Sequence, residues 1–214
     1  MNIQEKFERY KGLLREWNAR MNLVAPSTCA DIQTRHIDDS AQLAEYIPNG
    51  THVVDLGAGA GFPAVVLGIL GFDVIAIESI AKKCAFLNAV KSELALPNLT
   101  VINDRVENYI ARKTKDAYEL ARREHSERTS HTNGERSEQT RKTNGEIFTA
   151  RAFAPLVKIF DLTYGAGLPY LLLKGENVMA EIAEAAKKYK FDTQLIPSKT
   201  GPGFIVSINR VKKP

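Results

Sequence analysis

The sequence predicts an α/β fold in which helices cover a mostly parallel β-sheet. From residue 51 onward, short β-branched segments alternate with helical segments, which is typical of parallel sheets. A glycine-rich turn at residues 57–61 joins the first expected strand to the helix after it. The 214 residues are 44% hydrophobic and 25% charged, an ordinary globular composition that buries a core without disulfides or a metal.

Residues 1–50 are expected to form a helical extension ahead of a main domain at residues 51–214. Apolar residues recur there every three or four positions, as on one face of a helix. These residues are Ile3, Phe7, Tyr10, Leu14 and Trp17. Pro26 interrupts the pattern, and a second helical stretch is expected from about residue 31 to 46, ended by Pro-Asn-Gly at 48–50.

The main domain then reads as alternating elements. Strands are expected at 52–56, 74–78, 99–103, 147–151 and 169–174, and helices at 64–71, 81–96, 155–162 and 176–188. The last two strands, 191–196 and 204–209, are separated by a turn rich in proline, glycine and lysine. This spacing predicts a terminal hairpin.

A polar insertion is expected at about residues 113–145. Its stretch Arg122–Gly145 holds no Ala, Val, Ile, Leu, Met, Phe, Trp, Tyr or Cys, so it has no apolar surface to bury. Six basic and four acidic residues give it a charge of +2. We expect a disordered segment; a basic arm that touches RNA is the alternative, which the mixed signs disfavour.

Several function classes are not expected. Cys29 and Cys84 lie far apart and form no C-x-x-C pair, so we expect neither a metal site nor a disulfide, and a reducing cytoplasm fits. The uncharged stretch 56–72 is too short and glycine-rich to cross a membrane. The net charge of +4 is compatible with a nucleic-acid partner.

The glycine turn is the strongest candidate for a ligand site. Gly57, Gly59 and Gly61 let the backbone approach a ligand closely, and the helix that follows offers unpaired N–H groups. Residues 59–64 read G-x-G-x-x-A, which also fits a dinucleotide cofactor. Asp55 favours a cationic cofactor over a pyrophosphate by its charge, unless it only orders the turn. The pattern D-x-G-x-G-x-G resembles the first motif of class I S-adenosylmethionine methyltransferases.

Two more acidic positions fit a nucleoside. Glu78 ends the second expected strand, where both cofactor classes use a carboxylate to bind the ribose hydroxyls. Residues 104–107 follow the third strand, where class I methyltransferases usually contact adenine.

The methyl acceptor is inferred from what the sequence lacks. Residues 151–155 do not carry the Asn/Asp-Pro-Pro-aromatic motif of enzymes that methylate exocyclic amines. Methylation at pyrimidine C5 needs a cysteine nucleophile, and neither cysteine is suitably placed. Guanine N7 already has a free lone pair, so proximity and in-line orientation are enough and no general base is required.

A set of segments, taken in order, resembles the 16S ribosomal RNA guanine-N7 methyltransferase family, also called glucose-inhibited division protein B. These segments are Trp17-Asn18, Asn22-Leu23, Arg35–Ser40, Val54–Pro63, Glu78-Ser79, Lys82-Lys83, Arg105–Glu107, Arg151–Ala154 and Leu173–Gly175. The resemblance covers the chain outside about 113–145. Ala64 departs from it, because the family usually has glycine there.

The resemblance implies a seven-stranded class I fold and S-adenosylmethionine as cofactor, contacted by Gly57, Phe62, Val106, Glu107 and Arg151. It implies a target guanine in the decoding-region loop of 16S rRNA, within the small ribosomal subunit. Two alternatives stay open: an NAD(P)-dependent oxidoreductase that uses the same glycine turn, and a catalytically inactive RNA-binding assembly factor.

RNA contacts are expected from Arg35, His36 and Lys174 near the mouth of the cofactor site, mainly through phosphates. His36 is equally compatible with a buried hydrogen-bonding role, and Arg151 with an ion pair. We expect a monomer.

Overall fold

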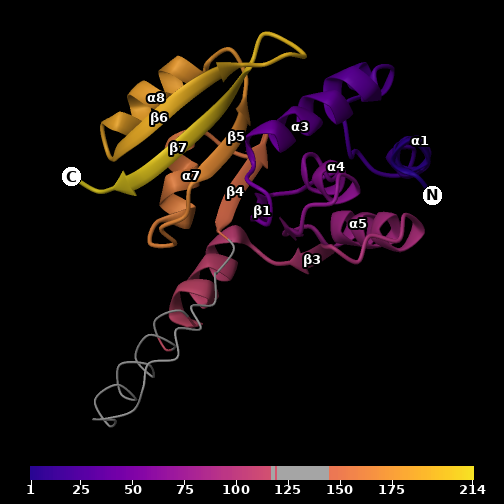
Figure 1. Cartoon of the computed structure of the whole chain (residues 1–214), viewed down its shortest axis with the longest axis horizontal. Helices are drawn as coiled ribbons and strands as arrows, with labels where there is room; N and C mark the ends of the chain where they lie inside the picture. Colours follow the sequence, from indigo (N-terminus) through magenta and orange to yellow (C-terminus); the bar gives the residue numbers. More distant parts are fainter. Residues whose placement is uncertain (117–118, 120–144) are drawn as a thin grey trace.

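The computed structural model describes residues 1–116, 119 and 145–214, and within them one seven-stranded sheet organises the chain (Figure 1). The strand order is β3-β2-β1-β4-β5-β7-β6. The strands are β1 His52–Leu56, β2 Val74–Glu78, β3 Leu99–Asn103, β4 Glu146–Arg151, β5 Tyr170–Lys174, β6 Lys190–Pro197 and β7 Phe204–Lys212. β7 runs antiparallel to β5 and β6 on either side of it, and the other four pairings are parallel, so the prediction of a mostly parallel α/β sheet is confirmed.

Alternate residues of the central strands face two separate hydrophobic cores. Val53 of β1 packs on the side of α1 Ile3–Asn18, α4 Ala64–Ile69 and α5 Ala81–Glu93. Val54 faces the other side, with α7 Leu156–Thr163, α8 Val178–Ala186 and a helix at 106–116. This alternation follows from the period of two in a strand that is buried on both faces.

The N-terminal extension packs on the first of these cores. Asn2 caps α1 through a capping box with Glu5. Tyr10 is fully buried and donates its hydroxyl hydrogen to the carbonyl of Ala60, at 2.6 Å. The apolar stripe therefore anchors the extension beside the glycine turn, although Ile3 at its start is 53% exposed.

The second expected helix, 31–46, is a helical path with three hydrogen-bonding patterns. A π-helical part at Gln33–Asp38 leads into α3 Asp39–Ala41 and a 3-10 part at Gln42–Tyr46. A short helix, α2 Pro26–Cys29, begins at the proline that interrupts the sequence pattern, because proline suits the first turn of a helix. The terminal hairpin is confirmed, with strands longer than expected.

The helix at 106–116 was not anticipated by the sequence analysis. It extends into the first residues of the predicted insertion 113–145, and Lys113 there forms an ion pair with Glu146 of β4 at 2.6 Å. The predicted disorder of 122–145 concerns residues that lie, except for Gly145, outside those described. Among the described residues, no helix is long and apolar enough to span a membrane, and no His/Cys/Asp/Glu group could hold a metal ion.

Candidate active site

The glycine turn after β1 has three residues with a positive φ, a backbone conformation that favours glycine. Gly57, Gly59 and Gly61 have φ values of 71°, 57° and 93°. A Cβ on Gly57 would lie 2.3 Å from the Phe153 ring, and one on Gly61 would lie 2.4 Å from Val65. The turn thus packs tightly against two neighbouring segments.

Two buried carboxylates hold this turn in place. Asp55 accepts hydrogen bonds from the backbone N–H of Ala64 (3.2 Å) and the hydroxyl of Thr149 (3.4 Å). Burial raises the pKa of Asp55 to about 7. Glu78 accepts from the N–H of Gly59 at 2.9 Å and from that of Ile80 at 2.8 Å. These contacts show that Asp55 orders the turn, which is the second of the two roles that the sequence allows for it.

A cavity of about 350 Å³ opens beside the turn at the carboxyl ends of β1, β2 and β3. Such edges of α/β sheets bind ligands. The lining residues are Gly57, Ile77, Ser79, Asp104, Arg105, Val106, Glu107, Phe153, Ala154, Lys158 and Leu162. Of the predicted cofactor residues, the cavity brings together Gly57, Val106 and Glu107. Gly59, Gly61, Phe62 and Glu78 support the turn and do not line it.

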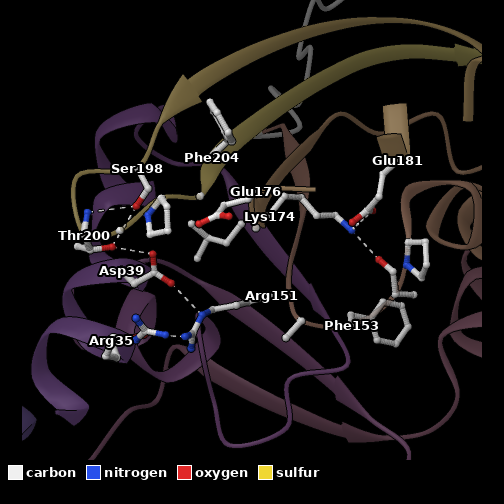
Figure 2. Close-up of a pocket in the computed structure, with 18 residues that line it drawn as sticks. Arg35, Asp39, Arg151, Phe153, Lys174, Glu176, Glu181, Ser198, Thr200 and Phe204 are labelled. Atoms are coloured by element: carbon white, nitrogen blue, oxygen red, sulfur yellow. Dashed lines mark hydrogen bonds and ion pairs between the residues drawn. The ribbon is translucent and has the colours of Figure 1, made fainter. Parts of the chain in front are cut away.

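A larger cavity of about 710 Å³ lies over the ends of β4 and β5 (Figure 2). Three elements form its walls: the helical path at Arg35–Asp39, the strand ends after Arg151 and Leu173, and the β6–β7 loop at residues 198–203. Phe153 and Ala154 line both cavities, so they form a shared wall between them. Ala152, just before this wall, has a φ of 51°, a strained backbone that positions the wall.

Arg151 lines the larger cavity but is held by the N-terminal extension. Its guanidinium contacts Asp39 at 2.8 Å, Nδ1 of His36 at 2.8 Å and the carbonyl of Arg35 at 2.6 Å. Asp39 in turn accepts from the hydroxyl of Thr200 at 2.8 Å. Burial lowers the pKa of Arg151, which Asp39 partly offsets. The ion-pair role of Arg151 is therefore present in the structure (Figure 2).

His36 is buried, 6% exposed, and lines neither cavity. Its ring stacks on Phe62 with centroids 4.8 Å apart. Since Arg151 donates to Nδ1, the proton sits on Nε2, which has no hydrogen-bond partner within the described residues. Burial and the Arg151 charge lower the pKa of His36 to about 4. The structure therefore matches the buried alternative for His36.

Lys174 lines the larger cavity, yet its ammonium group points into the protein. It donates to the carbonyl of Ala154 at 2.6 Å and to Glu181 at 2.7 Å, and its side chain is 9% exposed. Glu181 also accepts from the N–H of Leu156. Lys174 thus fixes the shared wall to α7 and α8. Arg35, by contrast, is exposed at the cavity.

Sequence reasoning missed several residues of the site. Asp39 belongs to the segment Arg35–Ser40 that resembles the family, but no local sequence pattern predicts that it forms an ion pair with Arg151. Phe153 belongs to the segment Arg151–Ala154, but the sequence predicts no role for it. No sequence motif marks Thr200 or Glu176 as site residues. Thr200 lies in the β6–β7 loop and Glu176 in the turn after β5, and only the folded topology brings them to the cavity.

The strand order, the single antiparallel strand and the cavities at one sheet edge define the class I methyltransferase fold. Solved structures share it at low identity. A S-adenosylmethionine-dependent methyltransferase from Aquifex aeolicus aligns with a TM-score of 0.53 and 12% identity, over 94% of this chain and 98% of that chain. A mutant of MtNAS in complex with S-adenosylmethionine gives a TM-score of 0.55 and 12% identity, over 99% and 76%.

Sequence comparison gives the family. Residues 3–124 match the model described as rRNA small subunit methyltransferase G. Ribosomal RNA small subunit methyltransferase G of Gluconobacter oxydans is 35% identical over 98% of this chain and 94% of its own length. The Caulobacter vibrioides protein of the same description is 37% identical over 98% and 86%. The chain belongs to the rRNA small subunit methyltransferase G family.

This membership confirms the family resemblance, the enzyme class and S-adenosylmethionine as cofactor. Small-subunit rRNA is the substrate. The dinucleotide interpretation of the glycine turn is thereby replaced, since the turn belongs to a methyltransferase.

Proposed function

We propose that this chain transfers the methyl group of S-adenosylmethionine, bound in the smaller cavity, to N7 of a guanine held in the larger cavity. The acceptor would be a guanine in the decoding-region loop of 16S rRNA, within the small ribosomal subunit. The observation that carries the proposal is that the two cavities adjoin at the shared wall of Phe153 and Ala154, because methyl transfer requires donor and acceptor sites side by side. We expect the chain to act in the cytoplasm as a monomer.

The residues around the smaller cavity fit the cofactor. Asp104 and Glu107 at the cavity supply carboxylates suited to a cationic ligand and to ribose hydroxyls. Val106 is buried and adds an apolar surface suited to a purine ring. When bound, the cofactor supplies an electrophilic methyl group.

The predicted cofactor residues then divide into two groups. Gly57, Val106 and Glu107 would touch the cofactor directly. Gly59, Gly61, Phe62, Glu78 and Arg151 would act by fixing the turn and the wall between the cavities. Phe62 links these parts, since it stacks on His36 and lies 5.7 Å from the Arg151 guanidinium.

Guanine N7 is the acceptor that fits these surroundings. Its lone pair carries no proton, so the enzyme needs to orient it rather than to deprotonate it. Cys84 is buried in α5, where its thiol donates to the carbonyl of Glu78 at 3.2 Å, and it lines neither cavity. Burial raises the pKa of this thiol, which further disfavours a nucleophilic role.

The substrate side uses the predicted basic residues in different ways. Arg35 is exposed at the cavity and suited to a phosphate contact. His36 and Lys174 would shape the cavity, because their polar atoms are engaged inside the protein.

The test is methyl transfer from radiolabelled S-adenosylmethionine to small ribosomal subunits that lack the modification, followed by mapping of the labelled nucleotide. We expect a single N7-methylguanine in the decoding-region loop. The variant Gly57→Arg, which fills the turn, should abolish incorporation and binding of S-adenosylhomocysteine.

Two outcomes would contradict the proposal. Label at another atom or nucleotide would show a different acceptor. Binding of the subunit and of S-adenosylhomocysteine without any transfer would identify an inactive RNA-binding factor.

A further inference from the structure

The larger cavity is lined by six charged side chains, and two ion pairs neutralise four of them. Arg151 pairs with Asp39 at 2.8 Å, and Lys174 pairs with Glu181 at 2.7 Å. The side chains that remain are Arg35 and Glu176. The cavity therefore presents one cation and one carboxylate to its ligand.

Glu176 is an exposed residue in the turn between β5 and α8. Figure 2 shows its side chain in the cavity, while Lys174 extends the other way toward Glu181. No hydrogen bond or ion pair engages the Glu176 carboxylate within the part of the chain that the structure describes. Its carboxylate is therefore available to a ligand.

The backbone that carries Glu176 is held in place. The N–H of Val178 donates to the carbonyl of Gly175 at 3.2 Å. The β6–β7 loop packs against the same turn so closely that a Cβ on Gly203 would lie 2.4 Å from the carbonyl oxygen of Lys174. A fixed turn presents its side chain at a defined place, as recognition of one base requires.

A free carboxylate in an RNA-binding cavity repels phosphates, so its natural ligand in RNA is a base edge that donates hydrogen bonds. Guanine offers two adjacent donors, N1–H and the 2-amino group, which match the two oxygens of a carboxylate. Adenine places an acceptor nitrogen at the first of these positions. A carboxylate therefore discriminates between the two purines.

We propose that Glu176 selects guanine by accepting hydrogen bonds from N1–H and the 2-amino group of the target base. This inference rests on the proposed function. N7 lies on the opposite edge of the purine from these two donors. A base held by Glu176 therefore leaves N7 free to face the shared wall and the methyl donor. Arg35, across the cavity, is suited to an adjoining phosphate.

The test compares guanosine with inosine, which keeps N1–H but lacks the 2-amino group. Small subunits are reconstituted with 16S rRNA that carries one or the other at the target position, joined by splinted ligation. For the wild-type protein, inosine should lower kcat/KM roughly tenfold or more. Glu176→Ala should lower kcat/KM on guanosine roughly ten- to a hundredfold and respond little to the inosine replacement.

Affinity for S-adenosylhomocysteine should be unchanged in Glu176→Ala, because Glu176 does not line the cofactor cavity. Glu184→Gln is the matched control: it removes one carboxylate from α8, lines neither cavity and should leave both substrates unaffected.

The inference is overturned if Glu176→Ala methylates guanosine within twofold of wild type. It is also overturned if the variant keeps the full wild-type preference for guanosine over inosine. Failure of the wild-type protein to methylate either subunit would instead overturn the proposed function itself.

Discussion

Asp39 and Arg151 lie 2.8 Å apart and join the N-terminal extension to the carboxyl end of β4. The same carboxylate accepts from the hydroxyl of Thr200 in the β6–β7 loop. One side chain of the extension thus connects two walls of the larger cavity. The extension consequently helps to line the larger cavity, which we propose for the acceptor, whereas the smaller cavity is lined only by residues from 57 onward.

Replacing Asp39 by asparagine should destabilise the protein. Arg151 is 21% exposed and would lose its counter-charge while Arg35 and His36 still hold it in place. We expect the free energy of unfolding in urea to fall by about 1–3 kcal/mol. Methyl transfer should fall more than affinity for S-adenosylhomocysteine, since the affected walls belong to the larger cavity.

The control for this change is Glu184→Gln, which breaks the exposed pair with Lys187. An exposed pair contributes little, so the loss should stay below about 0.5 kcal/mol. Equal losses in the two variants would show that the Asp39–Arg151 pair does not stabilise the fold.

His36 should make the protein less stable in mild acid. Its pKa of about 4 in the folded state lies below its usual 6.5, because burial and Arg151 disfavour the charged ring. Between these two pH values the unfolded chain binds the proton and the folded chain does not. The stability that His36 contributes is therefore complete above about pH 6.5 and is lost as the pH falls toward 4.

The measurement is the free energy of unfolding at pH 7.5 and pH 5 in the wild type and in His36→Asn. The variant should lose less stability on acidification, even if it is less stable at pH 7.5 without the Phe62 stack. Asp55, whose pKa is raised to about 7, has the opposite slope but is the same in both proteins. Parallel pH dependences would refute the assignment to His36.

Gly57→Ala should damage the cofactor site through one added methyl group. Its Cβ would lie 2.3 Å from the Phe153 ring, at a φ of 71° that disfavours alanine. We expect at least a tenfold loss of S-adenosylhomocysteine affinity by calorimetry. Backbone strain alone should also lower stability by about 1–2 kcal/mol.

Gly71→Ala separates the two effects, because Gly71 has a φ of 100° but nothing within 4 Å of a Cβ. It should lose stability and keep cofactor affinity. Adding Phe153→Ala to Gly57→Ala should restore part of the stability. A double variant no better than Gly57→Ala alone would mean that the contact with Phe153 is not the cause.

The sequence predicted the fold because its signals are local. Strand–helix alternation and the apolar spacing of Phe7, Tyr10 and Leu14 on α1 are set within a few residues, and the structure confirms both. The glycine turn is likewise local, since positive φ values favour glycine. These features also place the smaller cavity, which we propose for the cofactor, because the topology brings the ends of β1 to β3 together.

The partners of charged side chains were not predictable in this way. Arg151, Asp39 and Thr200 meet from three distant segments, and no local pattern connects them. Lys174 lies at a strand end, where a basic residue is expected to be exposed, yet its ammonium group donates to the carbonyl of Ala154 in the segment after β4. Sequence analysis therefore identified the residues of the larger cavity better than it identified their roles.

Lys174 and Arg35 should respond differently to replacement, although both are basic and both line the larger cavity. Lys174→Met removes the donor to Ala154 and Glu181, so the free energy of unfolding should fall by about 1–3 kcal/mol. Arg35→Ala removes an exposed guanidinium and should leave stability nearly unchanged.

The salt dependence of binding to small ribosomal subunits distinguishes the roles of Lys174 and Arg35. Each phosphate contact adds roughly one to the slope of log affinity against log salt concentration. The slope should decrease by about one in Arg35→Ala and stay constant in Lys174→Met. A reduced slope in Lys174→Met, with unchanged stability, would instead show that the Lys174 ammonium group turns outward to meet the RNA.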